Sequence, residues 1–274
     1  MIRFRILLIG LLLLLPGAAI ASNFVQLPVP FTPEIPDGTW TGNWKNACEE
    51  ASVTMVESYY LGNKKLRLPA ADAKAVMQQL FDWENKHFGR NSDSNATETA
   101  KYINEYSSFN ATVVTNPVLE DIKAELAAGR PVISLHFGKD LINPHHAWNP
   151  RGSYYHMMVL VGFDDASQEF IVNDTADYLT GLDYRYKYAT IMDTLRDFDH
   201  ATRKTVMPPT VLFTSPKQIW QAEGGKRLWL VQGDTKQYIS NPTAFKNHRL
   251  SGKLIKVVPA DKLTALTTGP SIDN

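Results

Sequence analysis

One cysteine stands in a context that suits nucleophilic chemistry. Cys48 is the single cysteine of the 274-residue chain and lies in the segment NWKNACEEAS. One thiol can form neither an internal disulfide nor a multi-thiolate zinc site. Two interpretations therefore stay open: a buried cysteine that packs as a small hydrophobic side chain, or a thiolate nucleophile.

The segment that follows Cys48 predicts a helix that begins at the cysteine. Apolar residues recur at near-helical spacing in CEEASVTMVESYY, with Glu49 and Glu50 in the first turn and loop-forming residues at 42–46 before it. The unpaired N–H groups of a helix amino terminus stabilise a thiolate. The two glutamates oppose this effect, but we expect them to project about 100° and 200° away from Cys48 around the helix, so that the opposition is partial.

A histidine and an aspartate supply the other parts of a catalytic set. His156 begins the continuous apolar run of HMMVLVGFDD, which predicts a buried strand, and Asp174 ends the short strand EFIVND. The intervening DDASQ predicts an antiparallel hairpin, which would bring His156 and Asp174 to the same end. An acid that orients an imidazole completes a Cys–His set. Taken separately, His156 could equally cap a strand, and 173–174 could be a simple turn.

A family resemblance follows from four segments in order: PVPFTPEIPDGTWTGNWKNACEEAS, LAAGRPVISL, HMMVLVGFDD and FIVND. From about residue 28 to residue 213 they resemble the bacteriocin-processing-peptidase-like (double-glycine-peptidase-like) branch of the papain-like cysteine peptidases. The resemblance implies an α+β papain-like fold, with a helical half that carries the cysteine and an antiparallel sheet that carries the histidine. It also implies that Cys48 is the nucleophile, His156 the general base and acid, and Asp174 the residue that orients the imidazole. Asn173 is the alternative for that last role, and strand alternation favours only one of the two neighbours.

The sequence departs from this family pattern before the cysteine. Papain-like enzymes commonly place a glutamine there to donate into the oxyanion hole, and no glutamine lies between Gln26 and Cys48. Asn43 is the candidate to donate in its place, together with the backbone N–H of Cys48. Losing one such donor costs about 10²–10³ in rate, so a slow enzyme also fits the sequence.

The amino terminus predicts export. Met1–Ala21 has two arginines, a short apolar run and the small-residue pattern AIA, which together are typical of a signal peptide cleaved after Ala21. An uncleaved anchor is the alternative. No later segment is apolar enough to cross a membrane, and there is no P-loop. We therefore expect a periplasmic or extracellular bacterial protein that acts alone and does not cleave leader peptides during export.

The remaining chain divides into two predicted parts. Residues 22–214 form the peptidase-like domain, with helices expected at 71–88 and at 97–108, the second capped by Thr97. Residues 215–274 form a small α+β module with strands at RLWLV, KQYIS and LIKVV and a short helix at NPTAFKNH. This part resembles a small module appended to bacterial exported proteins, for which a cell-envelope ligand and a purely structural role are both open.

Metal and nucleic-acid functions are not expected. Adjacent residues such as His145 and His146 rarely reach one ion, and no cysteine or carboxylate stands at ligand spacing. His136 reads as a satisfied core or surface histidine. The four tryptophans 40, 44, 83 and 148 could line a groove, although core packing is the alternative. Equal numbers of basic and acidic residues, 28 of each, give no basic surface for nucleic acid.

The sequence therefore predicts an exported cysteine peptidase or related amide hydrolase that acts on a peptide or protein through an acyl-enzyme, without cofactor or metal. Amide transfer would use the same residues. A catalytically silent peptidase-like protein, used for binding or for envelope structure, is the alternative from a different class.

Overall fold

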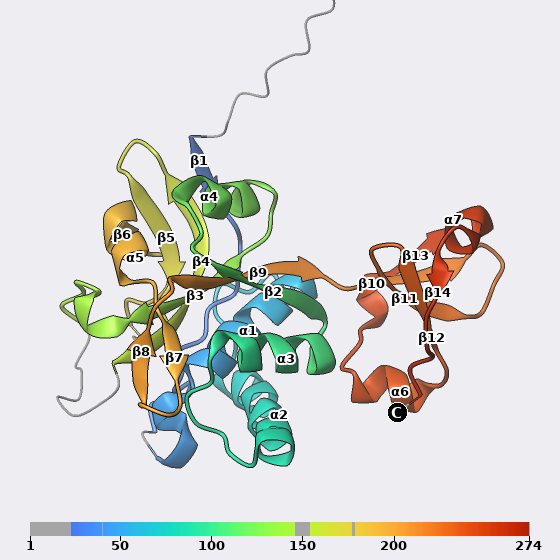
Figure 1. Ribbon diagram of the computed structural model, residues 1–274, viewed down its shortest axis with the longest axis horizontal. Coiled ribbons are helices and arrows are strands. Elements are labelled where there is room, and N and C mark those ends of the chain that lie inside the picture. Colours follow the sequence, from blue (N-terminus) through green and yellow to red (C-terminus); the bar gives the residue numbers. More distant parts are fainter. Residues whose placement is uncertain (1–22, 40, 146–153, 177–178, 274) are drawn as a thin grey trace, which may run out of the picture.

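The structure is a computed structural model that describes residues 23–39, 41–145, 154–176 and 179–273 (Figure 1). The predicted signal segment lies outside the described residues, and so do Trp40, His146 and Trp148. Two sheets organise the described chain, and Figure 1 shows them side by side, joined where one strand ends and the next begins.

A seven-stranded sheet forms the centre of the larger part. Its order is β2-β9-β3-β4-β5-β6, with β1 paired to the far half of β4, and every pairing in it is antiparallel. The predicted hairpin is present as β4 and β5. The strands are β1 (Phe24–Gln26), β2 (Phe109–Thr115), β3 (Val132–Phe137), β4 (Tyr155–Asp164), β5 (Glu169–Asn173), β6 (Tyr184–Lys187) and β9 (Thr210–Pro216).

Helices cover both faces of this sheet, which explains why β4 reads as an unbroken apolar run. The residues of β4 at 155, 157 and 159 pack with α1, α2 and α3, while those at 158 and 160 pack with α4 and α5. Figure 1 shows α1 to α3 together on one side. The helices are α1 (Cys48–Tyr60), α2 (Ala70–Phe88), α3 (Ala96–Tyr106), α4 (Leu119–Ala127) and α5 (Tyr188–Thr194), with 3₁₀ turns at Gly42–Asn46 and Gly138–Asp140.

Local chemistry sets the limits of these elements. The expected cap of α3 was wrong by two residues: the Asn95 side chain accepts from the N–H of Glu98, and Glu98 returns a bond to the Asn95 N–H. That reciprocal pair satisfies two free donors at once, which Thr97 could not do. Gly162 is required where β1 pairs with β4, because a Cβ there would lie 2.2 Å from the Val25 carbonyl oxygen.

The second sheet belongs to the carboxy-terminal part and has the order β13-β10-β11-β12-β14. The sequence predicted three of its strands but not β10, the partner that joins β11 to β13. Pro242 occupies the first turn of α6, where a proline is tolerated. Its elements are β10 (Gln218–Ala222), β11 (Leu228–Gln232), β12 (Thr235–Ile239), α6 (Pro242–Asn247), a 3₁₀ turn (Gly252–Leu254), β13 (Ile255–Val258), α7 (Ala260–Thr264) and β14 (Thr267–Thr268).

A further two-stranded sheet belongs to the larger part of the chain. It consists of β7 (Asp197–Asp199) and β8 (Lys204–Val206).

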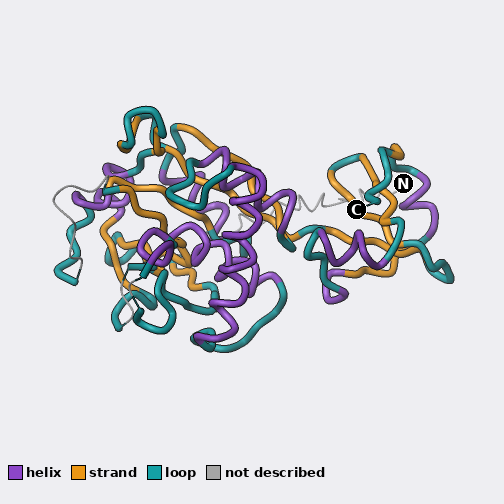
Figure 2. Tube along the Cα trace, turned by 90° about the horizontal axis from the view of Figure 1, so that it is seen from below, coloured by secondary structure: helices purple, strands orange, loops and turns teal. Residues whose placement is uncertain are grey.

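A buried ion pair joins the two parts. The Arg249 guanidinium donates to Glu57 of α1 at 2.5 Å, and the other carboxylate oxygen of Glu57 accepts from the Ser108 N–H at 2.9 Å. Arg249 also lies over the Tyr106 ring, 5.4 Å from its centroid. Figure 2 shows the second sheet as a separate body beside the helices. The helix that begins at Cys48 is therefore also the anchor of the carboxy-terminal part.

Candidate active site

The β4–β5 hairpin brings His156 and Asp174 into direct contact. Nε2 of His156 lies 2.8 Å from Oδ1 of Asp174, and both side chains are buried. His156 is the second residue of β4, and Asp174 directly follows β5, so antiparallel pairing places them at one end of the sheet. The prediction that His156 and Asp174 lie within reach of each other is confirmed.

Asp174 is held by further hydrogen bonds. The Tyr186 hydroxyl donates to Oδ2 of Asp174 at 2.6 Å, and the Asn143 amide nitrogen lies 3.4 Å from the same oxygen. Asn173 points to the opposite face, where its amide donates to the Val29 carbonyl. Alternation along β5 therefore selects Asp174, and not Asn173, as the neighbour of His156.

His136 lies directly opposite His156 in the β3–β4 register. Its two ring nitrogens contact the hydroxyls of Thr194 and Ser134, each at 2.8 Å, and the ring is fully buried. Burial and the adjacent His156 lower its pKa to about 3. His136 is thus a neutral, satisfied core histidine, which was the favoured interpretation from the sequence.

Cys48 is the first residue of α1 and lies beside the start of β4. It packs with Tyr155 and Met157, which occupy the face of β4 opposite to His156. Its Sγ donates to Oε2 of Glu49 at 3.0 Å, and Oε1 of Glu49 accepts from the Ser94 N–H at 2.8 Å. In this arrangement the thiol bonds to its neighbour in sequence, whereas the His156 ring bonds to Asp174.

The expectation that the helix start lowers the pKa of the Cys48 thiol, and so favours the thiolate, was wrong for this arrangement. Burial raises the pKa of Cys48 well above its ordinary value, and the carboxyls of Glu49 and Glu34 raise it further. A helical step of 100° separates the Cα–Cβ directions of Cys48 and Glu49, but the glutamate side chain is long enough to return to the sulfur. A long, flexible side chain does not keep the direction of its Cα–Cβ bond.

Glu34 is a site residue that the sequence did not reveal. It is 8% exposed, and its N–H donates to the Thr175 carbonyl at 2.8 Å, directly after Asp174. Burial raises the pKa of its carboxyl well above the ordinary value, and the charges of Glu49 and Asp174 add to that rise. No spacing rule links residue 34 to residue 174, so only the fold brings them together.

A second buried carboxyl pair lies between α1 and α2. Glu50 of α1 and Glu84 of α2 are 2% and 1% exposed. Burial raises the pKa of both carboxyls; the charge of Glu84 adds to the rise at Glu50, and the charge of Glu49 adds to the rise at Glu84, whose pKa is about 8. With Glu34 and Glu49, four buried acids therefore surround the first turn of α1. Such groups hold their protons to higher pH than exposed acids do.

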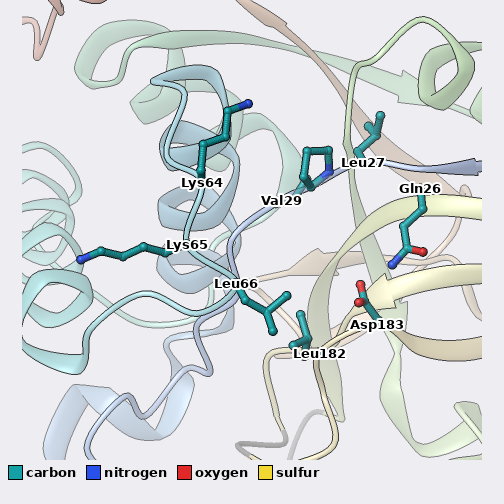
Figure 3. Close-up of a pocket in the computed structure, with 9 residues that line it drawn as sticks. Gln26, Leu27, Val29, Lys64, Lys65, Leu66, Leu182 and Asp183 are labelled. Atoms are coloured by element: carbon teal, nitrogen blue, oxygen red, sulfur yellow. The ribbon is translucent and has the colours of Figure 1, made fainter.

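A cavity between the amino-terminal segment and the loop after α1 is lined by none of the three predicted catalytic residues. It has a volume of about 310 Å³ and is lined by the segment at 26–29, by residues 64–66 and by Leu182 and Asp183 (Figure 3). Gln26 and Asp183 point toward each other on one side of it. Because neither Cys48 nor His156 lines it, this cavity supplies no chemistry of its own to the site.

The tryptophans that the sequence suggested as groove residues pack against the protein core where the structure describes them. Trp44 packs edge-on against Phe81, and Trp83 stacks on His87 in the core. The side chain of Asn43, the candidate oxyanion donor, lies outside the described part of the structure. Within the described residues, no three histidine, cysteine or acidic side chains are grouped as metal ligands. Across the same residues, none of the helices has the length and apolarity that a membrane span needs.

Comparison with known proteins assigns the family. The model of the Peptidase_C39 like family matches residues 24–206, which is most of the chain, and the chain belongs to this family. The α+β architecture agrees with the papain-like fold of such peptidases.

Two further comparisons give weaker information. The crystal structure of a Bacillus anthracis protein described as a C39-like peptidase is 15% identical, with a TM-score of 0.44, and the match covers 69% of this chain and 96% of that one. A comparison with curated protein sequences finds no match.

Proposed function

We propose that the protein is a cysteine-type peptidase, or a related amide hydrolase, in which Cys48, His156 and Asp174 act together. The observation that carries the proposal is the buried His156–Asp174 pair at 2.8 Å, next to a helix that begins with the single cysteine. Membership of a peptidase family supports the same reaction class. A peptide or protein is the substrate in this proposal, and residues 22–214 form the catalytic domain.

The chemistry follows from the positions of the three groups. His156 takes the Cys48 thiol proton, and the thiolate sulfur forms a bond to the substrate carbonyl carbon. His156 then gives the proton to the leaving amine as the C–N bond breaks, which leaves a thioester. Water, deprotonated by His156, hydrolyses the thioester and regenerates the thiol. Asp174 keeps the ring oriented and stabilises the imidazolium through Nε2, so that Nδ1 is the nitrogen that exchanges the proton.

One observation favours the alternative of a catalytically silent, peptidase-shaped binding protein. The Cys48 thiol bonds to Glu49, and the acids around it raise its pKa. A thiol in that state is a poor nucleophile at neutral pH. The two functions therefore differ in whether His156 can draw the proton away from the Cys48–Glu49 contact.

The deciding experiment measures the alkylation rate of Cys48 by iodoacetamide against pH in the wild type and in His156→Ala. Catalysis requires a reaction that persists below the free thiol pKa of about 8.5 and is lost in the variant. Cys48→Ala is the control for alkylation at other residues. A wild-type profile that follows an ordinary or raised thiol pKa, with no effect of His156→Ala, supports the silent binding protein.

We also propose export to the periplasm or the cell exterior, based on the sequence pattern of Met1–Ala21. The carboxy-terminal part at 215–274 is proposed as an accessory module that binds an envelope ligand. Fractionation of expressing cells, with detection of the mature amino terminus at Ser22 by mass spectrometry, tests the first of these proposals.

A further inference from the structure

Glu34 lies between the two halves of the proposed catalytic set. Its backbone N–H bonds to the Thr175 carbonyl, which fixes it next to Asp174, and its carboxyl interacts electrostatically with both Cys48 and Asp174. The side chain is more than nine-tenths buried. No group of the described residues donates a hydrogen bond to its carboxyl. A buried carboxyl without such donors at a reaction centre calls for a chemical role.

The surroundings of Glu34 favour its neutral form. The largest charge effects on its carboxyl come from acids: Glu49 and Glu50 from α1, Asp93 from the loop before α3, and Asp174 after β5. Burial disfavours a carboxylate, and each neighbouring negative charge disfavours it further. The His156 ring is engaged with Asp174.

A neutral carboxylic acid can do what the missing glutamine would do, because its O–H group is a hydrogen-bond donor. We propose that Glu34 is the oxyanion donor of this enzyme: its protonated carboxyl donates to the oxygen that becomes negative when Cys48 attacks a carbonyl. This inference rests on the proposed peptidase function and deepens it. A glutamine amide donates its hydrogen bond at any pH, whereas the Glu34 carboxyl donates only while it is protonated.

The proposal gives the enzyme an upper pH limit. When the Glu34 carboxyl ionises, the donor is lost, and a negative charge appears beside both the thiolate and the developing oxyanion. Both changes slow acylation. Glutamine at position 34 keeps the donor and the shape but cannot ionise, so that Glu34→Gln is expected to remove this limit.

The test compares two reactions of the same sulfur. Acylation of Cys48 by p-nitrophenyl acetate passes through an oxyanion, whereas alkylation by iodoacetamide does not. In the full chain below neutral pH, Glu34→Ala is expected to slow acylation by about 10²–10³ and to leave alkylation within about threefold of the wild type. Glu34→Gln is expected to acylate at the wild-type rate at low pH and to keep that rate at higher pH, where the wild type declines.

Glu84→Gln is the matched control, because Glu84 is also a buried carboxyl with a raised pKa but contacts Glu50 instead of the site. It should follow the wild-type profile in both reactions. The inference is overturned if Glu34→Gln is as slow as Glu34→Ala, if its decline at high pH matches that of the wild type, or if Glu34→Ala slows both reactions equally. Failure of the peptidase function itself would show separately, as a wild type whose Cys48 is neither acylated nor alkylated in a His156-dependent way.

Discussion

At the scale of single residues, the state of the site depends on where one proton lies. The Cys48 proton points to Glu49, while catalysis requires it on His156. Both glutamate oxygens are engaged, one by Cys48 and one by the Ser94 N–H. Glu49 therefore holds the thiol in its protonated form, and substrate binding has to break this contact before the sulfur can react.

Removing the acceptor should make the thiol more acidic. In Glu49→Gln the negative charge beside the sulfur is gone, so the pKa of Cys48 falls and the thiolate fraction at pH 7 rises, by about tenfold for each unit of the fall. The measurement is the iodoacetamide alkylation rate at pH 7. Glu50→Gln, which changes the next carboxyl along the helix, should have a smaller effect. An unchanged rate in Glu49→Gln would mean that Glu49 is already neutral.

Asp174 and Tyr186 should differ in how strongly they affect the reaction. Asp174→Asn removes the charge that stabilises the His156 imidazolium, and a loss of about 10²–10⁴ in acylation rate is expected by analogy with other triads. Tyr186→Phe removes only one hydrogen bond to Asp174, so about a tenfold loss is expected. Acylation by p-nitrophenyl acetate measures both. Equal losses in the two variants, with lowered melting temperatures, would indicate general disruption of the site.

At the scale of elements, the hairpin was predictable and the surroundings of the cysteine were not. The run after His156 is apolar on both faces, and an acidic turn follows it, so strand, turn and strand are local information. The choice of Asp174 over Asn173 needed the register, and the position of Glu34 needed the contact with Thr175. The return of Glu49 to the sulfur depends on a side-chain rotamer, which no spacing rule encodes.

The pairing of β1 with β4 is the element contact that precedes the segment carrying Glu34. Gly162→Ala would place a methyl group against the Val25 carbonyl, and such overpacking costs about 1–3 kcal/mol of the free energy of unfolding. Urea denaturation measures the loss. Gly252→Ala is the control, since an added Cβ meets no atom within 4 Å and the backbone there is not left-handed. A loss of the same size in Gly252→Ala would refute the steric explanation.

At the scale of the whole molecule, α1 links the proposed site to the carboxy-terminal part. Its first residue is Cys48, and its Glu57 holds Arg249 in a pair that is 4% and 15% exposed at the two side chains. Removing one partner of a buried ion pair leaves an uncompensated charge behind. The linkage therefore resembles a core contact more than a surface salt bridge.

Arg249→Met should weaken this linkage. About 3–5 kcal/mol of stability should be lost because the Glu57 carboxylate stays buried without its cation, and proteolysis between β9 and β10 should become faster. Lys253→Ala removes an exposed lysine that bonds to the Leu61 carbonyl nearby, and a change below about 0.5 kcal/mol is expected there. Chemical denaturation with limited proteolysis distinguishes the two. Equal stability of both variants would mean that the pair contributes nothing net.

The buried acids should make the molecule more stable at acidic than at alkaline pH. The pKa of Glu84 is about 8 in the folded protein, against about 4.3 for an exposed glutamate. The folded state thus binds more protons between these values, so the stability is full below about pH 4.3 and is lost as the pH rises toward 8. Melting temperatures at pH 5 and pH 8 should show this fall, and Glu84→Gln should reduce it. The same fall in both proteins would contradict the assignment.

The burial of Cys48 protects its thiol from oxidation in an oxidising compartment. A disulfide requires two Cβ atoms about 3.5–4.5 Å apart, and a sulfur that is 3% exposed cannot approach a second copy that closely. Two folded molecules should therefore not couple through their single cysteines, and peroxide should reach the sulfur only slowly. In this fold an unpaired thiol can stay reduced in air without a partner cysteine, and only a molecule admitted beside the first turn of α1 can react with it.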